Sequence, residues 1–171
     1  MPLYKFDGKT PKIHPTVFVA PTASVIGDVT IDEGSSVWPG AAIRGDFNSI
    51  TIGKYTSIQD NAVIHATPWN LTKIGDYVTV GHGAVIHAAT IENNILIGMR
   101  SVILDGSKIH KNSIIGAGSV VVENTEIPAN SLALGIPAKV IKTLDSEQEN
   151  RAQMGAMAYF QLAQKHKEEY G

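Results

Sequence analysis

The sequence predicts an all-β solenoid, a parallel β-helix of hexapeptide repeats, followed by one C-terminal α-helix. Two observations predict it: isoleucine or valine recurs every six residues over most of the chain, and glycine or asparagine recurs beside these positions. Neither the period of a helix nor the alternation of a strand explains a six-residue spacing, whereas a fixed repeat is typical of a solenoid. Each hexad is therefore expected to form one short strand and one turn.

Three hexads should close one triangular coil, with the branched side chains inside it and successive coils about 4.8 Å apart. The ladder of branched residues runs along the chain as Ile13, Val19, Val25, Ile31, Val37, Ile43, Ile52, Ile58, Ile64, Ile74, Val80, Ile86, Ile91, Ile97, Ile103, Ile109, Ile115, Val121 and Ile127. Turns such as Ile26-Gly27-Asp28 and Ile97-Gly98-Met99 carry glycine, which adopts tight or left-handed backbone at the lowest cost.

The six-residue spacing is interrupted three times, in the steps from Ile43 to Ile52, from Ile64 to Ile74 and from Ile86 to Ile91. Irregularities in a solenoid usually map to loops. If the order of the faces is kept through each interruption, Ile43, Ile64 and Ile86 share one face of the prism on successive coils. Ile58 and Val80 then share the preceding face.

Polar residues follow the ladder in two columns. Arg44, His65 and His87 each come directly after a ladder residue of one face, so we expect them to stack. Asp60 and His82 both stand two places past a ladder residue of the other face. His82 therefore projects from a different side of the prism and cannot easily join the other two histidines within one chain.

A threefold assembly that packs one face of a subunit against the other face of its neighbour would bring the three histidines together. Such a ring is closed and heterologous, and an otherwise open prism can form it without leaving contact surfaces unpaired. Three imidazoles without a carboxylate or thiolate suit Zn²⁺ and leave a fourth position for water, as in catalytic zinc sites. The sequence thus predicts a homotrimer whose metal ligands are His65, His82 and His87, with Fe²⁺ and Co²⁺ as alternatives to Zn²⁺.

The chain resembles the gamma class of carbonic anhydrases from His14 through the C-terminal helix. Three motifs carry the resemblance: Arg44-Gly45-Asp46, Gln59-Asp60-Asn61-Ala62-Val63-Ile64-His65 and Gly81-His82-Gly83-Ala84-Val85-Ile86-His87. It implies a left-handed β-helix and a zinc-dependent lyase that hydrates CO₂ reversibly to bicarbonate by a metal-bound hydroxide at the trimer interface. It also implies that two of the histidine ligands come from one subunit and His82 from the next.

The same resemblance assigns roles to the polar residues around the metal. It implies an ion pair between Arg44 and Asp60 across the subunit interface, with Asp46 supporting the arginine. Gln59 would hydrogen-bond the metal-bound water or bicarbonate, because its amide is both donor and acceptor. Tyr159 would close over the site.

Two stretches depart from the pattern of the gamma class. Phe47 stands where a glutamate proton shuttle is expected, and Ala66–Leu71 contains no acid. Phe47 and Trp69 near the metal would instead shape a pocket for an organic substrate. Since this fold also supports other functions, three alternatives stay open: a metal-dependent thioesterase, an acyltransferase acting on acyl-CoA, and a non-catalytic assembly subunit.

Composition bounds the remaining expectations. With 171 residues, 43% of them hydrophobic, the chain suits one structural domain: a β-helix over 1–144 and a packed helix within 145–171. We expect that helix from about Glu147 to His166, capped by Ser146, with Met154, Ala158 and Leu162 facing the prism.

The formal charge of −2 indicates no nucleic-acid partner, and the lack of cysteine excludes thiol chemistry and sulfur ligands. No window suits a membrane span and no signal peptide is recognised, so we expect a cytoplasmic protein without a membrane partner. His14, His110 and His166 are expected to be ordinary surface or core residues.

Overall fold

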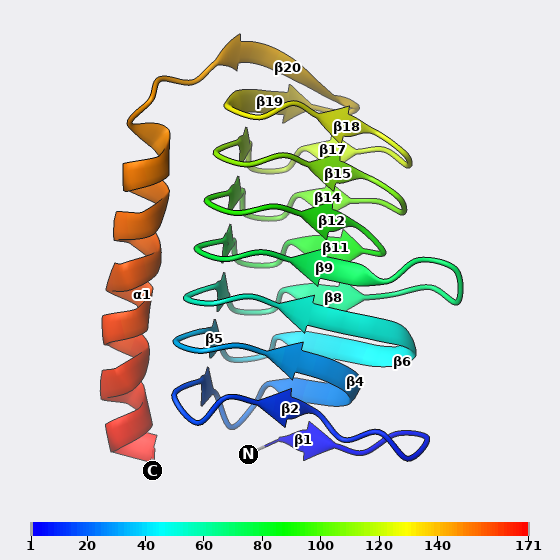
Figure 1. Cartoon of the computed structure of the whole chain (residues 1–171), viewed down its shortest axis with the longest axis vertical. Coiled ribbons are helices and arrows are strands. Elements are labelled where there is room, and N and C mark those ends of the chain that lie inside the picture. Colours follow the sequence, from blue (N-terminus) through cyan, green and yellow to red (C-terminus); the bar gives the residue numbers. More distant parts are fainter. Residues whose placement is uncertain (1, 171) are drawn as a thin grey trace.

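The computed structural model describes residues 2–170 and shows a three-sided parallel β-helix with a helix along one side (Figure 1). We name the three sides by their outward residues. The valine face contains β8 (Val63–His65), β11 (Val85–His87), β14 (Val102–Ile103) and β17 (Val120–Val121). The polar face contains β9 (Thr72–Ile74), β12 (Thr90–Ile91), β15 (Lys108–Ile109) and β18 (Glu126–Ile127).

Two long strands bend around the corner between these faces. They are β4 (Ser24–Ile31) and β6 (Ala42–Ile52), and the first coil adds β1 (Leu3–Tyr4) and β2 (Lys12–Ile13), which both pair with β4. The third side is the helix face, which contains β3 (Phe18–Val19), β5 (Ser36–Val37), β7 (Ser57–Ile58), β10 (Thr79–Val80), β13 (Leu96–Ile97), β16 (Ile114–Ile115) and β19 (Ser131–Gly135). At the C-terminal end, β20 (Ala138–Thr143) pairs antiparallel with β19 and ends the stack of parallel strands.

The strand registers confirm the predicted order of the faces. Ile43 pairs with Ile64 and Ile64 with Ile86 on the valine face, while Ile58 pairs with Val80 on the helix face. The interruptions of the ladder all lie at the corner between the valine and polar faces. They change the length of that corner and leave the strands on both faces in register.

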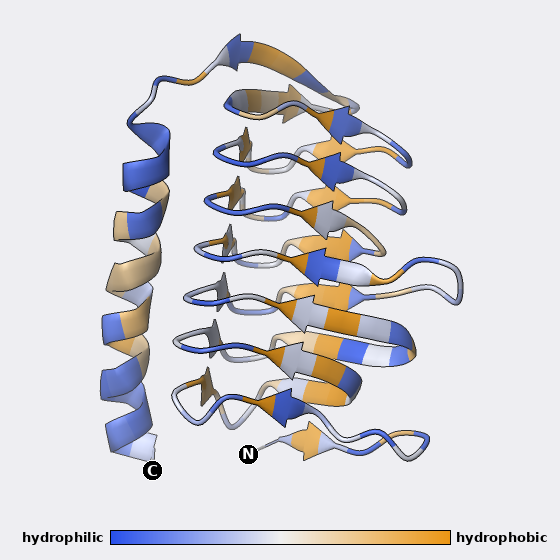
Figure 2. Cartoon of the chain, in the orientation of Figure 1, coloured by the Kyte–Doolittle hydropathy of each residue, from blue (hydrophilic) through white to orange (hydrophobic). Residues whose placement is uncertain are grey.

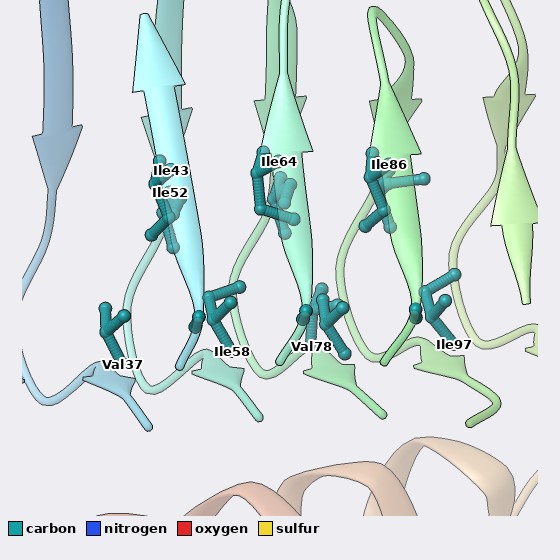
Figure 3. Packing of buried hydrophobic residues seen from close by; sticks show 14 of the residues in the cluster. Val37, Ile43, Ile52, Ile58, Ile64, Val78, Ile86 and Ile97 are labelled. Carbon is teal, nitrogen blue, oxygen red and sulfur yellow. The ribbon is translucent and has the colours of Figure 1, made fainter. Parts of the chain in front are cut away.

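The branched ladder residues form the core. Figure 3 shows Ile43, Ile64 and Ile86 in a row inside the coil, one from each successive turn of the solenoid. Each of these side chains is 0% exposed. Burying an aliphatic side chain of this size contributes about 1.5–3 kcal/mol, so the repeat stabilises every coil through its neighbours.

One glycine shows why the corners need small residues. Gly27 has a φ of +75°, and a Cβ placed on it would lie 2.5 Å from the carbonyl oxygen of Gly45 on the next coil. The backbones of β4 and β6 approach one another so closely here that no Cβ fits between them. The glycine-rich turns predicted from the sequence are therefore a packing requirement as well as a conformational one.

Helix α1 (Gln148–Tyr170) lies along the helix face (Figure 1) and extends four residues beyond the predicted end. The predicted capping residue is wrong: the observed hydrogen bond joins the Glu147 amide to the Asp145 carboxylate at 3.1 Å. The predicted apolar stripe is also wrong, since Met154 is 73% and Leu162 is 43% exposed.

The helix docks through small and aromatic side chains instead. Ala156 and Ala163 are buried against the prism, and Tyr159 packs edge-on to Trp38 with ring centroids 5.9 Å apart. His166 lies within the same aromatic group, 5.3 Å from Trp38 between ring centroids. Alanines permit close approach of the helix to the strands, which larger residues on the expected face would prevent. No helix in residues 2–170 is long and apolar enough to cross a membrane.

Candidate metal centre

Three polar residues stack at the edge of the valine face, as the sequence predicts. Arg44 pairs with His65, and His65 pairs with His87, on adjacent strands β6, β8 and β11. Their side chains emerge at the corner where the chain turns toward the polar face, which we call the loop corner (residues 45–49, 65–71 and 87–89). Ladder residues on both sides fix this column, because a shift of one residue would turn the histidines into the core.

His65 and His87 face one another at this corner. His65 Nδ1 lies 3.1 Å from His87 Nε2, and the ring centroids are 5.1 Å apart. The opposite nitrogens contact carboxylates: His65 Nε2 lies 2.9 Å from Asp46 Oδ1, and His87 Nδ1 lies 2.5 Å from Asp105 Oδ1. Both histidine side chains are partly shielded, with 12% and 33% exposure.

The donor set suits zinc. Two imidazole nitrogens bound to one tetrahedral zinc at about 2.0–2.1 Å lie roughly 3.4 Å apart, close to the separation of His65 Nδ1 and His87 Nε2. Metal-binding histidines also usually donate their second N–H to a carboxylate, as both rings can here. The loop corner therefore carries two of the three ligands that the sequence predicts.

Asp46 connects His65 to the arginine of the same column. Its carboxylate accepts hydrogen bonds from His65 and Arg44, and Arg44 also forms an ion pair with it. Burial raises the pKa of Asp46, but the hydrogen bonds from His65 and Arg44 and the charge of Arg44 together lower it below its ordinary value. Asp46 is thus held as an acceptor for the outer nitrogen of His65.

His82 lies at a different edge of the valine face. It belongs to the turn between β10 and β11, in what we call the glycine corner (residues 59–62 and 81–84), and its side chain is 49% exposed. Its Nδ1 lies 2.9 Å from Asp60 Oδ2 on the coil below. Within residues 2–170, no three His, Cys, Asp or Glu side chains gather where they could hold a metal ion.

Gln59 and Tyr159 lie on the side of His82. Gln59 is 4% exposed, and it lines a cavity of about 700 Å³ together with His82 and Tyr159. The cavity lies between helix α1 and the helix face, and most of its other lining residues are apolar, including Met99 and Ile97. A single chain thus divides the predicted site into two parts, with Arg44 paired to Asp46 in one and Asp60 beside His82 in the other.

The two aromatic residues singled out in the sequence lie at the loop corner. Phe47 is 62% exposed, and its ring centroid lies 5.8 Å from that of His65. Trp69 is 85% exposed in the loop between β8 and β9, which projects from the prism in Figure 1. A hydrogen bond of 3.0 Å from the Thr67 amide to the Asn70 carbonyl closes this loop.

Asp105 is not among the site residues predicted from the sequence. It stands two residues past the ladder residue Ile103, on the coil directly above His87. The only signal in the sequence is an acidic residue in the turn that stacks over a histidine turn. His14, His110 and His166 lie elsewhere, and each contacts a neighbouring side chain, as expected for ordinary residues.

The chain is similar to hexapeptide-repeat proteins and to carbonic anhydrases. Residues 88–123 match the family model for bacterial transferase hexapeptide (six repeats). The chain is 45% identical over 170 residues to gamma carbonic anhydrase 2, mitochondrial, of Arabidopsis thaliana, which covers 96% of this chain and 61% of that protein. It thus spans less than two thirds of the plant relative.

The chain covers a larger share of a bacterial relative and of a solved structure than of the plant protein. The chain is 43% identical over 145 residues to a carbonic anhydrase of Geobacillus kaustophilus, covering 85% of this chain and 80% of that one. A crystal structure from Bacillus cereus, provisionally described as an acetyltransferase, superimposes with a TM-score of 0.94 at 38% identity, covering 97% and 96% of the two chains.

Proposed function

The chain belongs to the gamma carbonic anhydrase family, and from this premise we propose that it hydrates CO₂ reversibly to bicarbonate at a zinc site between the subunits of a homotrimer. The observation that carries the proposal is the pair of facing nitrogens of His65 and His87, 3.1 Å apart, with a carboxylate behind each ring. This pair offers two ligands, and His82 of the adjacent subunit would be the third.

The uncovered valine face supports the trimer. Its outward side chains pair in one column, Ala42, Val63, Val85, Val102 and Val120. The polar face instead presents residues such as Lys108 and Glu126, and helix α1 covers the helix face. Figure 2 shows β11, β14 and β17 hydrophobic, while β15 and β18 carry hydrophilic residues. A partly exposed apolar column of this kind is typical of a subunit interface.

The two parts of the site lie at opposite edges of that valine face. His65 and His87 stand at the loop corner, whereas His82 stands at the glycine corner. A contact that joins the loop corner of one subunit to the glycine corner of the next is heterologous, and such contacts form a ring when the rotation between neighbouring subunits closes. The same contact brings Arg44 of one subunit toward Asp60 of the next, as the family pattern requires.

When bound, zinc supplies Lewis acidity and lowers the pKa of water from about 16 to about 7. The residues of the chain do the rest. Asp46 keeps the ring of His65 in place. Gln59, buried beside His82, offers an amide donor to a bicarbonate oxygen and an amide acceptor to a hydroxyl proton. Tyr159 lines the same cavity and limits access from the side of helix α1.

Proton release is the step that this chain supports least. The position next to Asp46, where a glutamate proton shuttle was expected, is occupied by Phe47, whose ring lies beside His65 and cannot carry a proton. We therefore expect hydration to be limited by proton transfer to buffer, so that the rate rises with buffer concentration. General acid–base groups typically raise a reaction rate about 10²–10⁴-fold, so the hydration rate in weak buffer should be lower by about this factor.

The cavity beside His82 favours one second candidate, hydrolysis of an acyl thioester at the same site. Its volume of about 700 Å³ far exceeds what CO₂ needs and lies in the range of about 300–1,000 Å³ that holds drug-sized ligands. Its largely apolar lining suits the acyl chain, and His82 and Gln59 are among its polar lining residues.

Stopped-flow CO₂ hydration with zinc measured on the same sample tests the proposal. The wild-type protein should hydrate CO₂ in proportion to its zinc, and His82→Ala should lose both. His110→Ala is the matched control, because His110 also contacts a carboxylate but lies on the polar face. Full zinc content in His82→Ala would contradict the shared site. A zinc-loaded protein that cleaves acyl thioesters without hydrating CO₂ would establish the second candidate.

A further inference from the structure

We propose that Asp105 is a positioning residue of the metal site: its carboxylate fixes the tautomer and orientation of His87, so that His87 presents Nε2 to the metal. This inference rests on the proposed function, since it requires a metal at the histidines. It concerns a residue from a different coil than any of the ligands, and one that the family motifs in the sequence do not include.

The backbone holds the Asp105 carboxylate over the histidine ring. The Gly106 amide donates to the Ala88 carbonyl at 2.8 Å, so the turn that contains Asp105 stacks directly on the turn that follows His87. The Ser107 amide donates to the Leu104 carbonyl at 3.2 Å and closes the upper turn. The two stacked turns therefore fix the 2.5 Å contact between Asp105 Oδ1 and His87 Nδ1.

Four side chains form one continuous row, Asp46, His65, His87 and Asp105. A neutral imidazole has one N–H, and a carboxylate can only accept. Asp46 therefore places the proton of His65 on Nε2, and Asp105 places the proton of His87 on Nδ1. The two inner nitrogens, 3.1 Å apart, are then both without a proton.

Two lone pairs that face one another at this distance repel unless a cation lies between them. A shared extra proton would satisfy one contact, whereas a divalent metal would accept both lone pairs at once. The two outer carboxylates thus prepare the pair of histidines for a cation, and each compensates part of its charge. Removal of the Asp105 carboxylate would leave the Nδ1–H of His87 without its acceptor, so that neither the tautomer nor the orientation of the ring is fixed.

Metal affinity measures this role directly. Loss of an outer carboxylate at a metal-binding histidine typically costs about 10–100-fold in metal affinity. Zn²⁺ affinity should therefore fall by about this factor in Asp105→Ala, measured on the assembled protein by competition with a chelator. Asp105→Asn keeps an acceptor without the charge, so its affinity should lie between those of Asp105→Ala and the wild type.

The structure offers a matched control. Glu92 contacts His110 Nδ1 at 3.0 Å, and this pair also joins residues 18 positions apart on neighbouring coils. Glu92→Gln therefore removes the carboxylate charge from the same kind of contact, as Asp105→Asn does, but at a distance from the metal site, and it should leave Zn²⁺ affinity unchanged. The visible absorption of bound Co²⁺ adds a second readout, because a turned His87 ring changes the ligand field while a merely structural role would not.

The outcomes separate the inference from the proposed function. Weaker Zn²⁺ binding and an altered Co²⁺ spectrum in Asp105→Ala, with partial recovery in Asp105→Asn, would support the positioning role. Zn²⁺ affinity in both variants equal to that of Glu92→Gln would overturn it and leave the proposed function intact. If the wild-type protein binds neither Zn²⁺ nor Co²⁺, both ideas fail. If Asp105→Ala does not fold, the isosteric Asp105→Asn decides alone.

Discussion

Two inactive variants should restore each other if the metal site is shared between subunits. A His65→Ala chain keeps His82, and a His82→Ala chain keeps His65 and His87. Neither variant alone can build a three-histidine site, because every interface in its trimer lacks one ligand. In a mixed trimer, an interface becomes complete wherever a His82→Ala chain offers its loop corner to the glycine corner of a His65→Ala chain.

The size of the effect follows from the ring. With equal amounts of the two variants and random assembly, each of the two neighbours at an interface has the required identity half of the time, so about one quarter of the sites are restored. Zinc content and CO₂ hydration, both measured after the variants are unfolded and refolded together, should reach about a quarter of the wild-type values.

A negative control uses two variants on the same side of the interface. His65→Ala mixed with His87→Ala should restore nothing, because both ligands must come from one loop corner, where their nitrogens lie 3.1 Å apart. Zinc retained by either pure variant, or a His65→Ala and His82→Ala mixture that stays without zinc and activity, would refute a site that spans two subunits.

Three further outcomes are expected. Ile86→Ala empties a fully buried position and should cost about 2–5 kcal/mol in the free energy of unfolding, measured by urea denaturation. The pKa of Glu92 is lowered first by the hydrogen bond from the Lys111 amide, against burial and with help from His110. A carboxyl group whose pKa is lowered by folding stabilises the fold at pH values above its ordinary pKa. This stabilisation is lost as the pH falls through the pKa of the folded state. Glu92→Gln should thus lower the thermal midpoint near neutral pH but not below that pKa, and an equal loss at all pH values would contradict this. Phe47→Glu should raise CO₂ hydration about 10²-fold or more in weak buffer by supplying a proton carrier, and no gain would show that another group already releases the proton.

Much of the fold could be predicted because a solenoid repeats one local rule. Isoleucine or valine at every sixth position fills the interior, and the observed registers Ile43 with Ile64 and Ile64 with Ile86 follow from counting faces. The same count separates His65 and His87 from His82. Since each coil contacts only its neighbours, local spacing is enough to place these residues.

The helix shows where this rule stops. Met154, Ala158 and Leu162 have helical spacing, yet the buried side of α1 contains Ala156 and Ala163. One helical sequence can often be packed through more than one of its faces. The choice depends on how closely the helix can approach the strands, and only the packed structure contains that information.

The sequence by itself determined the β-helix, the order of its faces, and the separation of the three histidines into two groups. Those features follow from a period that places each residue relative to its own coil. Only the tertiary structure decided the contacts between coils: the 3.1 Å approach of the two histidine rings, the carboxylate of Asp105 above His87, and the cavity beneath α1. These depend on side-chain rotamers and on the stacking of turns of unequal length, which a periodic pattern does not encode.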